Sequence, residues 1–116
     1  MIECINAVTL STGDMARAVA FYRSLGFELK YGGPEASFTS FHAGHSAINL
    51  RTGMPASPPL ARIIFWVGDV NEQHALALAA GLKPDFTPRD ASWGERYFHI
   101  DDPDGQGLSF ARLLER

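Results

Sequence analysis

The spacing of apolar residues predicts two helices, one in each half of the chain. The first covers residues 15–25, and its apolar side chains recur on one helix face at Met15, Ala18, Val19, Tyr22 and Leu25. The second covers residues 71–80, which are mostly strong helix formers. An aspartate suited to an N-cap precedes each helix and a glycine that ends it follows: Asp14 and Gly26 for the first, Asp69 and Gly81 for the second.

Short apolar segments bounded by turn residues predict the strands. They are residues 2–10, 27–31, 37–42 and 46–51 in the first half, and 62–67, 83–87, 96–100 and 106–113 in the second. A tight turn is expected at Asp102-Pro103-Asp104-Gly105. The proline-rich residues 52–60 fit neither pattern and predict a linker between modules at about 1–51 and 61–116.

The two halves also match each other in sequence. The matched segments are Gly13-Asp14 with Gly68-Asp69 (55 residues apart), Gly26 with Gly81 (55), Phe41-His42 with Phe98-His99 (57), and Ile48-Asn49-Leu50 with Leu108-Ser109-Phe110 (60). Each half has the order strand, helix and three strands, and the spacing changes only across turns. The chain is therefore expected to contain one βαβββ module twice.

Composition and charge argue against nucleic acids and membranes as partners. The 116 residues are 46% hydrophobic and carry a net charge of −3, with lysines and arginines scattered along the chain. A nucleic-acid or anionic membrane surface needs a basic stripe, so neither partner is expected. The longest apolar run, residues 75–80, is far too short to span a membrane. We find no signal-peptide pattern and a single cysteine, Cys4, so a cytoplasmic location is expected.

Three stretches resemble the glyoxalase/bleomycin-resistance/dioxygenase superfamily, also called the vicinal oxygen chelate family. They are Val8–Leu29, Ile63–Val70 and Trp93–Phe110, the last of which includes the Asp-Pro-Asp-Gly turn. The resemblance implies a single α+β domain in which tandem βαβββ modules form a curved mixed sheet around a cup. It also implies a homodimer, in which the modules pair either within one chain or across two.

Enzymes of this family bind a divalent metal through His, Gln or Glu on the first and last strands of each module. The resemblance carries those four positions onto Ala7, Asn49, Arg62 and Ser109. None of these residues is a normal ligand for such a metal, and the Arg62 guanidinium would repel one. We therefore expect no metal and no other cofactor.

Strand alternation separates a uniformly apolar face from a mixed face that suits the wall of a cup. Together with Arg96, the mixed face and the loop before the seventh strand provide the candidate ligand-binding residues: Thr9, Phe38, Asn49, Arg62, Trp66, Trp93, Arg96, Tyr97, His99 and Ser109. Aromatic walls favour an aromatic ligand, and Arg51, Arg62 and Arg96 could orient an anionic one. Alternatively, the two tryptophans fill the core or a dimer interface.

The positions of the histidines in the sequence do not identify a catalytic residue. His42 and His99 occupy matched positions in the repeat, which fits either a shared role or two partly solvated strand residues. A displaced metal site formed by His42, His99 and Glu95 is a further alternative.

Three functions follow from these patterns. The leading hypothesis is a metal-independent small-molecule-binding protein similar to the bleomycin-resistance branch, which would sequester an aromatic or anionic compound. The second is an enzyme: a lactoylglutathione-lyase-like or ring-cleaving dioxygenase-like protein, or a metal-free isomerase that uses His99 or Glu95. The third is a structural module whose cup is filled by side chains.

Overall fold

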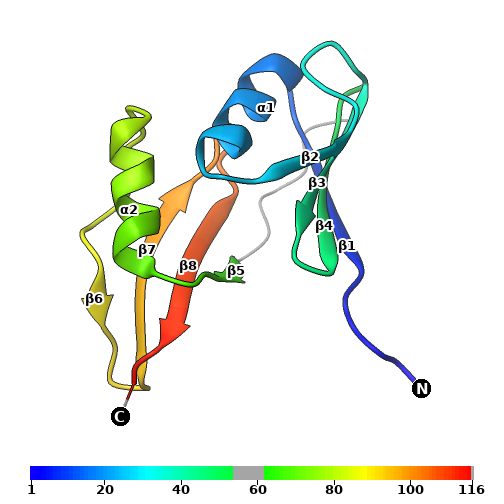
Figure 1. Ribbon diagram of the computed structural model, residues 1–116. Helices are drawn as coiled ribbons and strands as arrows, with labels where there is room; N and C mark the ends of the chain where they lie inside the picture. Colours follow the sequence, from blue (N-terminus) through cyan, green and yellow to red (C-terminus); the bar gives the residue numbers. More distant parts are fainter. Residues whose placement is uncertain (54–61, 116) are drawn as a thin grey trace. The chain divides into compact units, whose positions relative to one another are not determined.

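The computed structural model describes residues 1–53 and 62–115. The elements in these ranges are β1 (Ala7–Ser11), α1 (Met15–Ser24), β2 (Glu28–Tyr31), β3 (Phe38–Ala43), β4 (Ser46–Arg51), β5 (Ile63–Trp66), α2 (Val70–Ala79), β6 (Arg89–Asp90), β7 (Glu95–Asp101) and β8 (Gly107–Leu113). This order is βαβββ written twice, which confirms the predicted α+β fold (Figure 1). Neither helix within the described ranges is long and apolar enough to cross a membrane.

The chain forms two compact units, residues 1–58 and 59–116. The boundary falls inside the predicted linker, of which residues 54–60 lie outside the described part of the chain. Each unit contains one βαβββ module and one four-stranded sheet.

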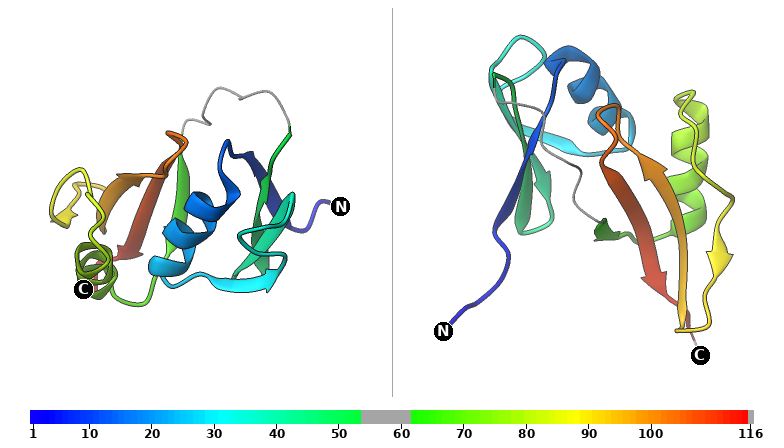
Figure 2. Two further views of the ribbon diagram at one scale, coloured as in Figure 1. Left: turned by 90° about the horizontal axis from the view of Figure 1, so that it is seen from above. Right: turned by 180° about the vertical axis from the view of Figure 1, so that it is seen from behind.

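The sheet of the first unit has the order β1-β4-β3-β2. β1 runs parallel to β4, whereas β3 is antiparallel to both of its neighbours. Asp14 is the N-cap of α1, and its carboxylate accepts a hydrogen bond from the Arg17 amide at 3.0 Å. The helix lies against one face of its own sheet (Figures 1 and 2). Tyr22 is fully buried beneath it, and its ring lies 5.9 Å from that of Phe41.

The sheet of the second unit repeats this arrangement with the order β5-β8-β7-β6. Asp69 caps α2 by accepting a hydrogen bond from the Glu72 amide at 3.1 Å. The buried core between α2 and the sheet contains stacked Phe98 and Phe110, whose rings are 5.4 Å apart. α2 buries fewer side chains than α1, and it leaves Leu78 exposed.

Two strand predictions were wrong. The first strand was expected over residues 2–10, but it begins only at Ala7. The strand expected over 83–87 is not formed, and β6 lies later, at Arg89–Asp90. Pro84 and Pro88 lack the amide hydrogen that a sheet ladder requires, so they interrupt the pairing. This segment still forms one hydrogen bond with β7, which the Asp85 amide donates to the His99 carbonyl at 2.8 Å.

Strand register corrects one match within the repeat. Thr9 pairs with Asn49 and Ile64 pairs with Ser109, which agrees with the predicted spacings of 55 and 60 residues. Ser40 pairs with Asn49, however, and His99 pairs with Ser109. Ser40 and His99 are therefore equivalent, at a spacing of 59 residues. The predicted match of His42 with His99 was therefore wrong, and by the same register His42 corresponds to Asp101.

Candidate functional site

The sheet of the second unit has two chemically different faces. Phe98 and Phe110 pair across β7 and β8 on the face covered by α2. Successive side chains of a strand point to opposite faces, so the neighbours of these two residues in the sequence lie on the other face. There Ile64, Ser109 and His99 form one row across β5, β8 and β7. We call this surface the aromatic face, and it is made by Arg62, Ile64, Trp66, Phe86, Trp93, Tyr97, His99 and Ser109.

Four rings meet at the centre of the aromatic face. The Tyr97 ring lies 5.2 Å from His99, 5.6 Å from Trp93 and 5.6 Å from Phe86. Phe86 also contacts the His99 ring at 5.1 Å, and the Arg89 guanidinium lies 3.5 Å above the Phe86 ring. Such mixed tilted and edge-to-face contacts hold aromatic rings in defined orientations.

The edges of the aromatic face are open to solvent. Ile64 is 63% exposed, Trp66 55% and Trp93 65%, although all three are large and apolar. Trp93 is nevertheless held in place, because its indole Nε1 donates to Glu95 Oε1 at 2.6 Å. Ser109, in the same row as Ile64, is buried. The face therefore combines a buried polar centre with exposed apolar walls.

Arg62 immediately precedes β5 and lies beside the row of Ile64 and Ser109. Its Nη1 donates a hydrogen bond to the Leu108 carbonyl at 2.8 Å. A Cβ atom at Gly107 would come within 3.2 Å of the guanidinium carbon, so the glycine provides the space in which the guanidinium lies. Arg62 is half-buried as a result.

His99 lies close to several charged side chains. Partial burial lowers its pKa from the ordinary value of 6.5, and the positive charges of Arg62 and Arg89 lower it further. Asp85 and Asp101 oppose this effect. Because burial and the arginines dominate, His99 is neutral near pH 7, when its imidazole can accept a proton.

Three predicted site residues lie in the first unit, where they share one face of its sheet. Asn49 Nδ2 donates to Thr9 Oγ1 at 3.2 Å. Phe38 pairs with Arg51 two residues further along β4, on the same side as Asn49. The Phe38 ring stacks on Tyr31 at 5.8 Å, and Tyr31 is itself 54% exposed.

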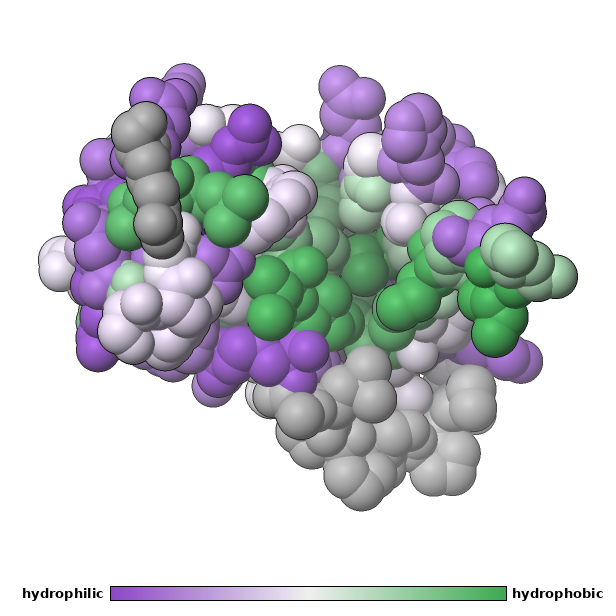
Figure 3. Space-filling view, turned by 90° about the horizontal axis from the view of Figure 1, so that it is seen from below, coloured by the Kyte–Doolittle hydropathy of each residue, from purple (hydrophilic) through white to green (hydrophobic). Residues whose placement is uncertain are grey.

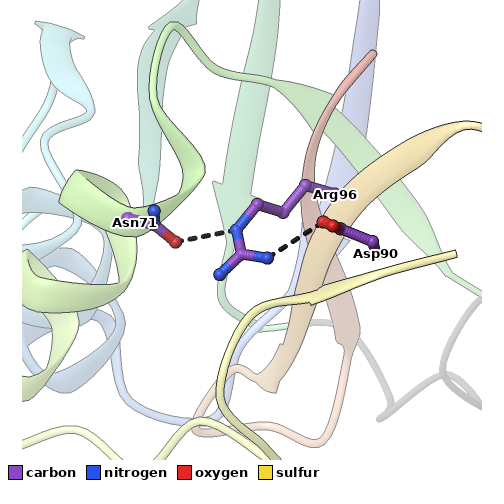
Figure 4. A network of polar contacts seen from close by, with 3 residues as sticks. All are labelled: Asn71, Asp90 and Arg96. Carbon is purple, nitrogen blue, oxygen red and sulfur yellow. Dashed lines mark hydrogen bonds and ion pairs between the residues drawn. The ribbon is translucent and has the colours of Figure 1, made fainter. Parts of the chain in front are cut away.

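Arg96 is not brought together with the other candidates. It pairs with Arg112, one residue out of phase with Tyr97 and on the side of β7 that faces α2. Its Nε donates to Asn71 Oδ1 at 2.8 Å, and its Nη1 forms an ion pair with Asp90 at 2.9 Å (Figure 4). Arg96 thus links α2, β6 and β7. Phe86, which sequence reasoning missed, takes a place in the aromatic face, and nothing in the sequence distinguishes it from other aromatics in a predicted strand.

The residues at the four positions that bind metal in related enzymes do not suit a metal. Asn49 offers only a neutral amide oxygen, Arg62 brings a positive charge, Ser109 is a neutral hydroxyl and Ala7 has no donor atom in its side chain. Among the residues that the structure describes, no three His, Cys, Asp or Glu side chains lie close enough together to hold an ion. Glu95, one member of the alternative site, accepts the hydrogen bond from Trp93.

Solved structures with the same fold include several from bacteria. TioX from Micromonospora sp. ML1 is 28% identical, with a TM-score of 0.79 over 97% of this chain and 100% of that one. A glyoxalase/bleomycin resistance protein/dioxygenase from Nocardioides is 20% identical, with a TM-score of 0.76 over 99% and 86%. Lactoylglutathione lyase from Agrobacterium tumefaciens is also 20% identical, with a TM-score of 0.77 over 95% and 93%.

No curated protein matches this sequence. The sequence profile of the Glyoxalase/Bleomycin resistance protein/Dioxygenase superfamily, in contrast, matches residues 4–110. That range includes both βαβββ modules apart from the last residues of β8. The chain belongs to the glyoxalase/bleomycin resistance protein/dioxygenase superfamily.

Proposed function

We propose that this protein binds a small aromatic or anionic compound without the help of a metal and sequesters it rather than transforming it. The observation that carries the proposal is the aromatic face, where Trp66 and Trp93 stay exposed beside a buried serine and a neutral histidine. Exposed indole rings near fixed hydrogen-bonding groups suit the stacking and orientation of a planar molecule.

The donor chemistry supports binding over metal-dependent catalysis. Lyases and dioxygenases of this superfamily polarise their substrate with a divalent ion, and the side chains at the four corresponding positions cannot hold one. This favours the bleomycin-resistance-like branch, whose members bind a ligand stoichiometrically. Within the first unit taken by itself, Thr9, Phe38 and Asn49 stay predicted ligand contacts. Arg96 instead links α2, β6 and β7.

The test is a titration of metal-free protein with planar aromatic compounds, followed by tryptophan fluorescence. Saturable quenching at one ligand per site is expected, and it should persist in excess chelator. Metal analysis after incubation with Zn²⁺, Ni²⁺, Fe²⁺ or Mn²⁺ should find less than stoichiometric metal. Tight stoichiometric metal together with lyase or dioxygenase turnover would overturn the proposal.

His99 favours a second candidate, a metal-free enzyme. Its pKa is lowered by burial and by Arg62, so the neutral imidazole is available as a general base near pH 7. Glu95 lies on the same face of β7 but is engaged by Trp93, which makes it the weaker base. Any turnover that His99→Ala leaves unchanged would count against catalysis by this residue.

A further inference from the structure

The three candidate arginines differ in their burial and in their hydrogen-bond partners, and this difference indicates which of them is placed to bind a charged group of the ligand. Arg96 already binds a carboxylate and an amide. Arg51 is exposed at the end of β4 in the first unit. Arg62 alone is half-buried on the aromatic face, next to the central rings.

Arg62 is fixed in position, yet most of its donors remain available. A guanidinium has five N–H donors. Within the described residues, Arg62 makes one hydrogen bond, from Nη1 to the Leu108 carbonyl. That bond and the space above Gly107 orient the planar group over the start of β8, and no acidic side chain in the described part of the chain pairs with it.

The charges around this position suit an anion with a single charge. Arg62, Arg89, Asp85 and Asp101 all contribute to the electrostatic field at His99, two of them positive and two negative. With two acidic side chains in this region, each further negative charge on a ligand adds repulsion, so a dianion such as a phosphate monoester is opposed more strongly than a monoanion. A carboxylate is monoanionic and planar, and its two oxygens match the fork of a guanidinium.

The position of Arg62 also relates the anion to the rings. Arg62 and Ile64 are two residues apart on one side of β5, which corresponds to about 6.6 Å along a strand. Ile64 lies in the same row as Ser109 and His99, with Tyr97 beside His99. A carboxylate bound to Arg62 would therefore place an attached ring over this row.

We propose that Arg62 is the anion-binding residue of the aromatic face and that the ligand is an aromatic carboxylate. This inference rests on the proposed function, because it assumes that the aromatic face binds a small molecule. It adds that the carboxylate forms charge-assisted hydrogen bonds with the free N–H groups of Arg62.

The experiment compares 2-naphthoate with 2-naphthamide, which has nearly the same shape but no charge. Calorimetry on the whole chain near pH 7 should give roughly ten- to hundredfold tighter binding of the carboxylate. Arg62→Gln should reduce this preference to about one while leaving the affinity for the amide unchanged. Arg62→Lys keeps the charge but loses the forked pair of donors, so its preference for the carboxylate should lie between those of the wild type and Arg62→Gln.

Two further variants separate position from charge and from folding. Gly107→Ala retains Arg62 but displaces its guanidinium, because the new Cβ would lie 3.2 Å from it, and it should weaken the preference. Arg112→Gln removes an equal charge from the other face of β8 and should bind both compounds as the wild type does.

The outcomes distinguish the inference from the proposed function. If the wild type binds both compounds equally, or if Arg62→Gln and Gly107→Ala both keep the preference, Arg62 is not the anion-binding residue and the proposed function stands. If no aromatic compound of either charge binds, the proposed function itself fails, and this inference with it.

Discussion

His99 shows how a few neighbours set the properties of one residue. Its ring contacts those of Phe86 and Tyr97, and partial burial lowers its pKa, with a further contribution from the positive charge of Arg62. Charging this imidazole costs more in the folded protein than in the unfolded chain. The folded state therefore binds fewer protons than the unfolded state at mildly acidic pH, and folding stability depends on pH.

The direction of this dependence can be predicted. The stability that neutral His99 provides is complete above the unfolded pKa of about 6.5, and it is lost as the pH falls from there through the lower folded pKa. Urea unfolding between pH 7.5 and pH 5 should show a larger loss for the wild type than for His99→Gln. His45→Gln, at an exposed position between β3 and β4, should follow the wild type. Parallel curves for the wild type and His99→Gln would contradict the assignment.

Gly32 gives a second prediction at the residue scale. Its φ of 88° is unfavourable for other residues, and a Cβ there would lie 2.4 Å from the Phe38 carbonyl oxygen. Gly32→Ala should lower the free energy of unfolding by on the order of 3 kcal/mol, from backbone strain and a steric clash. Gly44 also has a positive φ of 62° but nothing within 4 Å of the added Cβ, so Gly44→Ala should cost only about 1 kcal/mol. Chemical denaturation measures both, and equal losses would contradict the role of the clash.

At the scale of elements, the sequence predicted helix ends correctly, because a helix end requires a particular residue type at a particular backbone position. Asp14 and Asp69 both accept the hydrogen bond expected of an N-cap, and Gly26 and Gly81 both adopt a positive φ just after a helix. The strand predicted over 83–87 failed because a run of alternating residues does not show whether its prolines can be accommodated in a ladder. Pro84 and Pro88 cannot donate to a ladder with β7, so only the Asp85 amide bonds to that strand.

The duplicated caps should contribute equally to stability. Asp14→Ala and Asp69→Ala each remove one hydrogen bond of about 3 Å to a helix amide that has no partner within the helix. Each substitution should lower the free energy of unfolding by about 1 kcal/mol, and circular dichroism during denaturation would measure it. Asn at either position should restore most of the loss, because its side chain also caps helices. Failure of Asn to rescue would indicate that charge, rather than the cap, is responsible.

At the scale of the molecule, the repeat predicted the architecture, because the two halves share the pattern that forms each module. It predicted the site less well. Alternation along β5 and β8 placed Arg62, Trp66 and Ser109 on one face, and the register supports this arrangement. Arg96, which the sequence offered for its charge, pairs with Arg112 on the side of β7 opposite Tyr97, and Phe86 enters the site from a segment whose path is set by tertiary contacts.

Hydrophobic residues reach the surface on the face drawn in Figure 3. The exposure of Trp66 leaves two roles for this residue. The family resemblance predicts a homodimer, so the exposed indole either contacts the ligand, as we propose, or lies in a subunit interface. It is 55% exposed in the chain itself, so it does not fill the core. These roles predict opposite results for the same substitution.

We expect Trp66→Ala to weaken the binding of 2-naphthoate by roughly tenfold, because one stacking partner is lost, and to leave the assembly unchanged. Sedimentation equilibrium should give the mass of two chains for both proteins. Leu78→Ala, on a side chain of α2 that is also 55% exposed, serves as the control and should retain full affinity. If Trp66→Ala instead dissociates the dimer while each chain keeps its affinity, Trp66 belongs to the interface. The wall of the binding site would then consist of Trp93, Tyr97 and Phe86, whose rings lie together on the same face.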